Sequence, residues 1–271
     1  MVRLRDKALP LLILTVVLLV ASGLRFHLLG AQSLWNDEGS SYVQALRPFA
    51  EIAANAGRDI HPPGYYWLLA GWRLLTGTSE FALRSLSAFA SLLSIAFAAA
   101  LGRRLFGWAA GIPAALLIAL NTFNIYYAQE ARMYALLALW SSASFWALAG
   151  LFQCKTWRWA VALGLFNAAG LWTQYAFPFV MLAQGVVAVV WLVANLTPVS
   201  RHSTPPLHDV ERGKQPQVAW GEVMRGLGRY IAANVLAILL YLPWLPTALH
   251  QLTTWPNTGD ATPFAEAFNT V

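Results

Sequence analysis

Seven apolar segments divide the sequence, and each is about as long as a helix that crosses a membrane. The hydrocarbon core of a bilayer requires about 17–25 mainly apolar residues of helix. The segments of this length lie at residues 8–29, 81–102, 106–124, 133–152, 158–176, 177–196 and 230–249. Only 11% of the 271 residues are charged, whereas soluble domains carry about 25%. We therefore predict an all-α polytopic membrane protein, a single membrane domain over residues 1–271 with about seven transmembrane helices.

The first apolar segment follows three basic residues, as the apolar part of a secretory signal peptide does. Its apolar character continues through residues 24–29, so an uncleaved anchor is favoured over a cleaved signal. With a cytoplasmic amino terminus, seven crossings place twelve of the 18 lysines and arginines inside, as the positive-inside rule requires. Residues 30–80 and an outer tail at 250–271 are then outside, and a flexible loop at 197–229 is inside. The basic residues form no single patch, so nucleic acid is not an expected partner.

The outer segment 30–80 is long for a loop, and two amphipathic juxtamembrane helices are predicted within it. Apolar residues recur three and four apart over residues 38–55, which is typical of an amphipathic helix on a membrane surface. A second helix is predicted to begin at Pro62 and to end at Gly77. Tyr65 is one of several aromatic residues in it that are expected at the level of the lipid headgroups.

The sequence WNDEGSSY places two adjacent carboxylates, Asp37 and Glu38, at the start of the first outer helix. An aspartate at a helix start can accept hydrogen bonds from free amides, although Asn36 could do so equally well. A carboxylate held against a bilayer can instead have a raised pKa and act as a general base. The spacing alone leaves both capping and catalysis open for Asp37.

The sequence RDIHPPGYY brings Asp59 and His61 together immediately before the second outer helix. These side chains could hold a metal with Asp37, but two ligands at this spacing are a weak signal without a third ligand nearby. His61 and the free amides of the new helix could alternatively bind a phosphate. A turn that only fixes the entry into the helix is the third interpretation.

Polar residues also interrupt the apolar sequence at the outer ends of later segments. Gln129, Glu130 and Arg132 lie in YYAQEARMYALL, and ionisable groups near membrane depth are expected to have partners. Glu130 and Arg132 could pair with polar neighbours, or Arg132 could bind a phosphate through its planar guanidinium. Arg84, in EFALRSLSAF, could extend to lipid headgroups or contribute to the same anion site as His61. Cations beside an acidic pair suit transfer of a group from a phosphate-linked lipid.

At these motifs the chain resembles the membrane glycosyltransferases of fold type C. It is most similar to the bacterial enzymes related to protein O-mannosyltransferases and to the aminoarabinose transferase of lipid A. The matching stretches, in the family's order over residues 24–137, are LRFHLLGAQSLWNDEGSSY, DIHPPGYYWLL, EFALRSLSA and YYAQEARMYALL. A match to one such stretch would be weak evidence for this family, whereas matches to four stretches, in order and on one face, are specific to it.

The resemblance implies an inverting transferase that moves a sugar from a polyprenyl-phosphate donor to a hydroxyl of a lipid, glycan or protein acceptor. It assigns Asp37 as the general base and Glu38 as its neighbour or as a residue that orients the acceptor. The residues expected to bind the donor phosphate or the substrate are His61, Tyr65, Arg84, Gln129, Glu130 and Arg132. No metal and no cofactor are expected. The site is expected on the outer face of the bacterial inner membrane.

Enzymes of fold type C usually have more spans than the seven predicted here. We therefore expect an amino-terminal module that is truncated relative to the family, with a partner chain as one source of the remaining part. One alternative is a metal-dependent enzyme of the same fold that uses Asp37 with Asp59 or His61. Another is a lipid-binding or transport protein without catalysis. Transporters place ionisable groups near the midplane of the membrane, whereas here these groups cluster at the outer end.

Overall fold

The computed structural model describes residues 2–196 and 217–254, and within these ranges every regular element is a helix. The helices are α1 (Val2–Phe26), α2 (Asn36–Ala45), α3 (Phe49–Ala56), α4 (Gly64–Thr76), α5 (Glu80–Phe106), α6 (Trp108–Leu120), α7 (Thr122–Ala128), α8 (Tyr134–Cys154), α9 (Trp157–Thr173), α10 (Phe177–Leu196), α12 (Gln217–Tyr241) and α13 (Leu245–Thr254). The prediction of an all-α protein is confirmed for this part of the chain.

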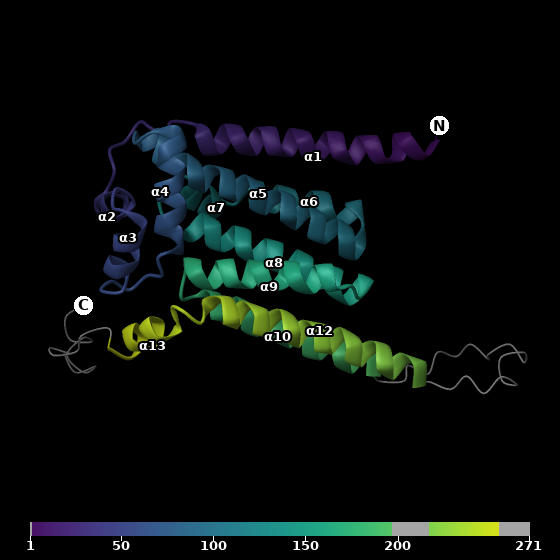
Figure 1. Cartoon of the computed structure of the whole chain (residues 1–271). Helices are drawn as coiled ribbons and strands as arrows, with labels where there is room; N and C mark the ends of the chain where they lie inside the picture. The colour runs from purple at the N-terminus through teal and green to yellow at the C-terminus, as the bar shows by residue number, and fades with distance from the viewer. Residues whose placement is uncertain (1, 197–216, 255–271) are drawn as a thin grey trace, which may run out of the picture.

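The long helices lie side by side in a bundle, with their axes in roughly one direction (Figure 1). In this bundle α5 packs against α1, α6 and α8, while α9 packs against α8 and α12. The shorter helices α2, α3, α4 and α13 gather at the end opposite the amino terminus of α1 (Figure 1). That end therefore carries the segments in which the candidate site residues lie.

Five helices are long and apolar enough to cross a membrane, namely α1, α5, α8, α10 and α12. The pair α6 and α7 is bent by 61° at a short break and would be a sixth span if it crosses as one unit. Helix α9 packs within the bundle but has only 17 residues. Length and apolar composition thus support five or six spans, and the predicted count of seven is not confirmed.

The last predicted span, at residues 230–249, is wrong in its position. Helix α12 ends at Tyr241, and the chain turns before α13 begins at Leu245. The sequence LPWLP contains two prolines at this turn. Proline lacks an amide donor and disfavours the helical conformation of the residue before it, so a helix does not continue through this sequence.

The predicted flexible loop at residues 197–229 is also corrected in part. Residues 217–229 belong to α12, while residues 197–216 lie outside the described residues. Of the predicted outer tail, residues 250–254 belong to α13, and the rest lies outside the described part of the chain.

The outer segment 30–80 contains three helices instead of the predicted two. The predicted helix 38–55 is divided into α2 and α3, because Pro48 is the residue that precedes α3 and its ring cannot continue α2. Helix α4 agrees with the prediction, since it follows Pro63 and ends at Gly77. The φ angle of Gly77 is 92°, a left-handed conformation that glycine adopts without a steric penalty.

A buried arginine stabilises the bend between α6 and α7. Arg25, at the end of α1, is fully buried and donates to the carbonyl oxygens of Ile118 at 3.3 Å and Ala119 at 3.1 Å. The last carbonyls of a helix have no partner within it, and the guanidinium satisfies two of them. It also donates to Asn124 in α7 and to Ser91 in α5. One side chain thus joins four helices.

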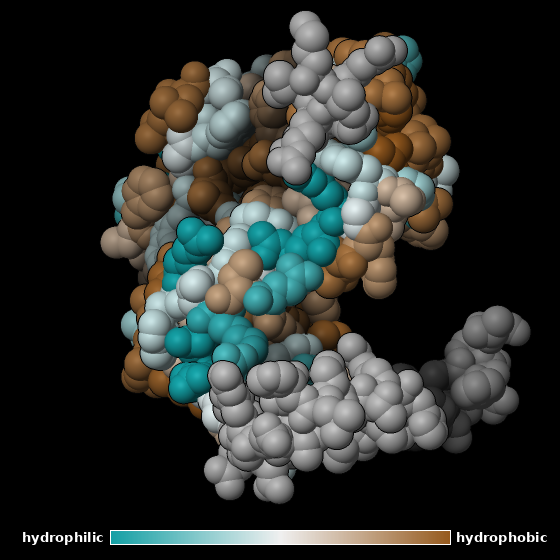
Figure 2. All heavy atoms as spheres, turned by 90° about the vertical axis from the view of Figure 1, so that its right-hand side faces the viewer, coloured by the Kyte–Doolittle hydropathy of each residue, from teal (hydrophilic) through white to brown (hydrophobic). Residues whose placement is uncertain are grey.

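The opposite end of the bundle, which carries the amino terminus of α1, has a polar centre and apolar flanks (Figure 2). At this end of α5, the guanidinium of Arg103 lies 4.6 Å from the ring centre of Trp108, and that of Arg104 lies 4.2 Å from the ring centre of Trp159. Cations over aromatic rings are attracted by the ring's charge distribution. Pairs of this kind join α5 to α6 and α9 at this end.

Helix α4 approaches α9 closely at its first residue, Gly64. A Cβ atom on Gly64 would lie 2.4 Å from the carbonyl oxygen of Trp172, which is closer than any non-bonded contact allows. The rings of Trp67 and Trp172 also pack together, with their centres 5.3 Å apart. This contact fixes the start of α4, and with it the preceding segment that carries Asp59 and His61.

We expect Gly64→Ala to lower the free energy of unfolding by about 1–3 kcal/mol, because overpacking forces the backbones of α4 and α9 apart. Gly71→Ala is the matched control on the same helix, since a Cβ there would meet nothing within 4 Å. The control should be neutral or stabilising by about 0.5–1 kcal/mol, because alanine favours helix over glycine. Thermal unfolding in detergent measures both, and equal stabilities for the two variants would contradict the close approach.

Candidate active site

Glu38 on α2 and Arg84 on α5 form a buried ion pair at the end of the bundle opposite the amino terminus of α1. Arg84 Nη2 lies 2.6 Å from Glu38 Oε2, and Arg84 Nε donates to Oε1 at 2.8 Å, which is a bidentate geometry. The remaining N–H groups donate to the carbonyl oxygens of Leu29, Gln32 and Ser33. All five donors of the guanidinium are therefore engaged. None is free for the phosphate contact that we predicted for Arg84.

Glu38 is held by backbone groups as well as by Arg84. It accepts hydrogen bonds from the amide of Ala131 at 2.7 Å and from that of Trp35 at 3.3 Å. Burial alone would raise the pKa of Glu38, but Arg84 and the two amides hold it below its usual value. The pair therefore contributes stability at neutral pH that is lost as the pH falls through this lowered pKa. With 1% of its side chain exposed, Glu38 is better suited to positioning than to proton transfer.

Asp37, the residue before Glu38, lies beside Arg132 and keeps 41% of its side chain exposed. Arg132 Nη2 lies 3.6 Å from Asp37 Oδ2. Arg132 Nη1 donates to the carbonyl oxygen of Asp37 at 3.3 Å and to the hydroxyl of Ser41 at 3.2 Å. The residue that precedes α2 is Trp35, and the side chain that accepts a hydrogen bond from its amide, at 3.3 Å, is that of Glu38 and not that of Asp37. The capping interpretation of Asp37 is therefore not supported, and its carboxylate remains accessible.

Three buried polar atoms near this pair have no hydrogen-bond partner among the described residues. They are His61 Nδ1, the hydroxyl oxygen of Tyr65 and Arg132 Nε. Arg132 interacts electrostatically with Tyr65, Tyr66 and Asp37, so these groups share one region between α2, α4 and the segment before α8. A buried polar group without a partner costs about 1–3 kcal/mol. A bound polar ligand would offset that cost.

Tyr65 and Tyr66 form the buried floor of this region. Burial raises the pKa of Tyr65 well above its usual value and raises that of Tyr66 to about 12. Both hydroxyls therefore keep their protons at neutral pH and can donate hydrogen bonds. Their rings lie edge to face, with centres 5.4 Å apart, which is a favourable geometry for aromatic pairs.

Asp59 and His61 lie next to each other, with His61 Nδ1 3.6 Å from Asp59 Oδ2. His61 holds the pKa of Asp59 below its usual value, although burial opposes this shift. Among the residues that the structure describes, no three His, Cys, Asp or Glu side chains are grouped as metal ligands. The metal interpretation of Asp37 with Asp59 or His61 thus finds no ligand cluster in this part of the chain.

The segment that carries Asp59 is tied to α13. Gln251 Nε2 donates to the carbonyl oxygen of Ala56 at 2.7 Å and to that of Asp59. The side-chain oxygen of Gln251 accepts a hydrogen bond from the hydroxyl of Tyr175, to which Trp244 Nε1 also donates at 3.0 Å. No sequence signal indicated this tether, because a single glutamine near an apolar segment has no distinctive spacing.

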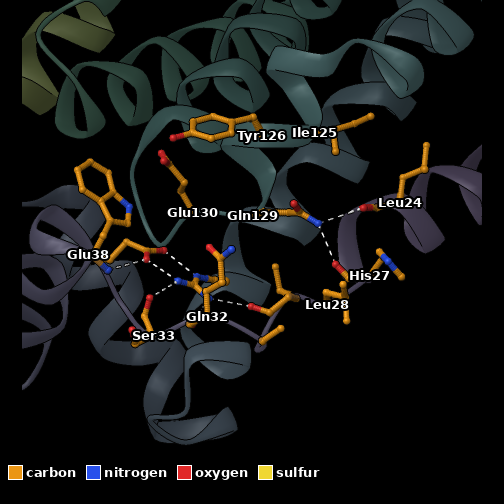
Figure 3. A pocket seen from close by; sticks show the side chains of 14 residues that line it. Leu24, His27, Leu28, Gln32, Ser33, Glu38, Ile125, Tyr126, Gln129 and Glu130 are labelled. Carbon is orange, nitrogen blue, oxygen red and sulfur yellow. Dashed lines mark hydrogen bonds and ion pairs between the residues drawn. The ribbon is translucent and has the colours of Figure 1, made fainter.

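Gln129 and Glu130 lie away from Asp37, where they line a cavity of about 690 Å³. The cavity lies between the end of α1, the segment before α2 and α7 (Figure 3). The amide nitrogen of Gln129 donates to carbonyl oxygens at the end of α1. Burial raises the pKa of Glu130, although a hydrogen bond from Tyr126 opposes this shift. Glu38 and Arg84 also line the cavity, so their ion pair forms the wall on the side of Asp37.

The structure thus divides the predicted site residues into three groups. Around the accessible carboxylate it brings together Asp37, Tyr65 and Arg132, and His61 lies beside Asp59, whose carboxylate interacts electrostatically with Arg132. In the buried ion pair it places Glu38 and Arg84, and along the separate cavity it places Gln129 and Glu130. Three residues of the region that the sequence interpretation did not single out are Ser41, Tyr66 and Gln251. The roles of all these residues in binding or catalysis remain predictions.

We expect Glu38→Gln to lower the free energy of unfolding by about 3–5 kcal/mol, because it leaves the buried guanidinium of Arg84 without its counter-charge. Glu51→Gln, on the exposed surface of α3, is the control and should change stability by less than about 0.5 kcal/mol. Thermal unfolding in detergent compares the two. Equal effects would contradict the role of the ion pair.

We expect Gln251→Leu to speed hydrogen exchange of the amides at residues 56–61 by about tenfold, since it removes two hydrogen bonds that hold this segment. The membrane-spanning helices should keep the exchange rates of the wild type. His250→Gln, an exposed neighbour on α13, is the control. Unchanged exchange at residues 56–61 in Gln251→Leu would show that α13 does not hold the segment.

Comparison with known proteins shows which proteins this chain is similar to. The family described as dolichyl-phosphate-mannose-protein mannosyltransferase matches residues 60–205. A curated relative from Pseudomonas fluorescens, undecaprenyl phosphate-alpha-4-amino-4-deoxy-L-arabinose arabinosyl transferase 1, is 29% identical over 255 residues. The match covers 89% of this chain, which spans only 40% of the length of that relative.

A solved structure, the S. cerevisiae protein O-mannosyltransferase Pmt1–Pmt2 complex bound to the sugar donor, has a similar fold. The TM-score is 0.61 at 13% sequence identity, over 89% of this chain and 34% of that chain. At this identity the likeness concerns the fold alone. The family match, which extends over more than half of the chain, shows that the protein belongs to the dolichyl-phosphate-mannose-protein mannosyltransferase family of membrane glycosyltransferases.

Proposed function

We propose that this protein transfers a sugar from a polyprenyl-phosphate donor to a hydroxyl of an acceptor at the outer face of the bacterial inner membrane. Family membership supports glycosyl transfer in a membrane. The name of the curated relative specifies an undecaprenyl-phosphate amino sugar. Because the chain spans 40% of that relative, extending this activity to the chain, alone or with a partner chain, is part of the proposal.

The observation that carries the proposal is an accessible carboxylate beside unpartnered buried polar groups. Asp37 has 41% of its side chain exposed, whereas Arg132 beside it has 6%. Arg132 Nε, the Tyr65 hydroxyl and His61 Nδ1 accept or donate no hydrogen bond among the described residues, although His61 Nδ1 lies 3.6 Å from Asp59 Oδ2. A guanidinium and a phenol that retain free N–H and O–H groups are suited to the oxygens of a phosphate. These groups would therefore hold the donor's phosphate next to Asp37.

The chemistry would proceed in one displacement. Asp37 accepts the proton of the acceptor's hydroxyl as that oxygen attacks the anomeric carbon of the donor. The bond from this carbon to the phosphate oxygen breaks on the opposite side, and the electron pair leaves with the phosphate. Arg132 stabilises the negative charge that develops there. A single displacement inverts the configuration at the anomeric carbon.

In this mechanism Glu38 and Arg84 would hold Asp37 in position and would not themselves touch the substrate. Their ion pair holds the first residues of α2, and Asp37 lies directly beside Glu38 in the chain. The two adjacent acids would thus have different tasks because their environments differ, with one buried and paired and the other accessible. Holding base and phosphate in fixed geometry contributes to rate by proximity.

We expect Asp37→Asn to reduce sugar transfer by about 10²–10⁴-fold, the usual contribution of a general base. Donor binding should persist, because the phosphate contacts remain. Arg132→Gln should weaken donor binding as well as transfer. The assay is transfer from a panel of radiolabelled polyprenyl-phosphate monosaccharides in membranes that contain the full chain, with donor binding measured by photocrosslinking.

Glu51→Gln serves as the control for the loss of a carboxylate and should transfer sugar as the wild type does. Chelator should leave transfer unchanged, and loss of transfer in chelator would favour the metal-dependent alternative. Equal transfer by Asp37→Asn and the wild type would remove Asp37 from the role of base. A wild-type chain that neither binds the donor nor transfers sugar would overturn the proposal.

A further inference from the structure

The cavity that Glu130 lines is separate from the site around Asp37 and has its own chemical character. Asp37 is not among the lining residues, whereas Glu38 and Arg84 close the cavity on that side. The volume of about 690 Å³ lies within the range of ligand sites in proteins, about 300–1,000 Å³. This cavity is therefore large enough for a ligand of its own.

The charges that line the cavity leave one carboxylate uncompensated. Glu38 and Arg84 neutralise each other in their ion pair. Glu130 is 7% exposed, and no cation lies within ion-pair distance of it among the described residues. Figure 3 shows its carboxylate beside the ring hydroxyl of Tyr126, which donates a hydrogen bond to it. A buried carboxylate is costly unless a cation or further donors approach it.

The buried donors of the cavity wall are already used inside the protein. Arg84 donates its five N–H groups to Glu38 and to the carbonyl oxygens of Leu29, Gln32 and Ser33. Gln129 donates both N–H groups to carbonyl oxygens at the end of α1. The buried guanidinium and amide of the wall therefore have no N–H group left for a ligand, and the net charge of the wall repels an anion. A ligand that pairs with the buried carboxylate of Glu130 must bring both hydrogen-bond donors and positive charge.

The other side of the cavity is apolar and lies at the end of a membrane span. Leu24, Leu28, Leu29 and Ile125 line it, and the apolar span of α1 ends at Phe26. Leu28 is 70% exposed, so the cavity reaches the surface there. An apolar chain could leave the cavity along this side into the hydrocarbon region of the membrane.

We propose that this cavity binds an amphiphile with a primary ammonium head group, whose N–H groups donate to Glu130 and whose apolar chain lies against the end of α1. A primary ammonium supplies a positive charge and three donors for the buried carboxylate of Glu130. Its hydrogen bonds to a buried carboxylate are charge-assisted and about twice as strong as neutral ones. A quaternary ammonium has no N–H group and should bind more weakly.

The test uses the full chain in detergent with two phospholipids that differ only at the head group. Phosphatidylethanolamine carries a primary ammonium, and phosphatidylcholine with the same acyl chains carries a quaternary one. Native mass spectrometry or displacement of a fluorescent analogue measures the ratio of their affinities. We expect the wild type to favour phosphatidylethanolamine by about tenfold, and Glu130→Gln to abolish this preference.

Two further variants and one competitor complete the test. Glu51→Gln, which removes an exposed carboxylate on α3, should keep the wild-type preference. Tyr126→Phe should weaken the preference for phosphatidylethanolamine only in part, and this variant tests the same site if Glu130→Gln does not fold. Soluble ethanolamine should compete poorly if the apolar side contributes. Full competition by ethanolamine would show that the ligand is a soluble amine, and an equal preference in the wild type and Glu130→Gln would overturn the proposal.

Discussion

The buried ion pair between Glu38 and Arg84 holds together four segments at the end of the bundle opposite the amino terminus of α1. It connects α2 with α5, and its remaining hydrogen bonds reach the chain after α1 and the amide of Ala131. Removing two charges from water is costly, and such a pair stabilises a protein only when the remaining donors and acceptors are satisfied. Here the guanidinium has no free donor and the carboxylate accepts from two backbone amides as well. The positions of Asp37 on one side and of the cavity on the other both depend on this arrangement.

Arg25 performs a related task deeper in the bundle, without a carboxylate partner. Its donors meet the free carbonyl oxygens at the end of α6, where the partial negative charge of a helix is concentrated. The carbonyl oxygens at the bend between α6 and α7 thereby accept hydrogen bonds in a region where little water is available to donate them. Two arginines thus organise the same end of the molecule, one through a charge pair and one through backbone dipoles.

The sequence allowed much of the fold to be predicted, because apolar length and helix-ending residues are local signals. Helix α4 begins and ends where its prolines and Gly77 indicate, and most apolar segments are helices. The break between α2 and α3 at Pro48 and the bounds of α12 differ from the prediction, because the prediction followed the apolar residues past the prolines that end these helices. Which candidates lie together could not be predicted in full. Arg84 and Arg132 look equivalent in sequence, and only the contacts with residues 29–38 show that all the donors of Arg84 are occupied.

The tether from Gln251 to the carbonyl oxygens of Ala56 and Asp59 joins residues that are up to 195 positions apart. The bundle includes extensive contacts between helices that are neighbours in the chain, such as α5 with α6 and α8 with α9, and such local contacts form early. Helix α13 is synthesised after all the other described helices. The segment with Asp59 and His61 therefore gains these hydrogen bonds late in biogenesis. A growing chain can insert its spans first, and the carbonyl oxygens of Ala56 and Asp59 meet their side-chain donor only when the last of these helices arrives.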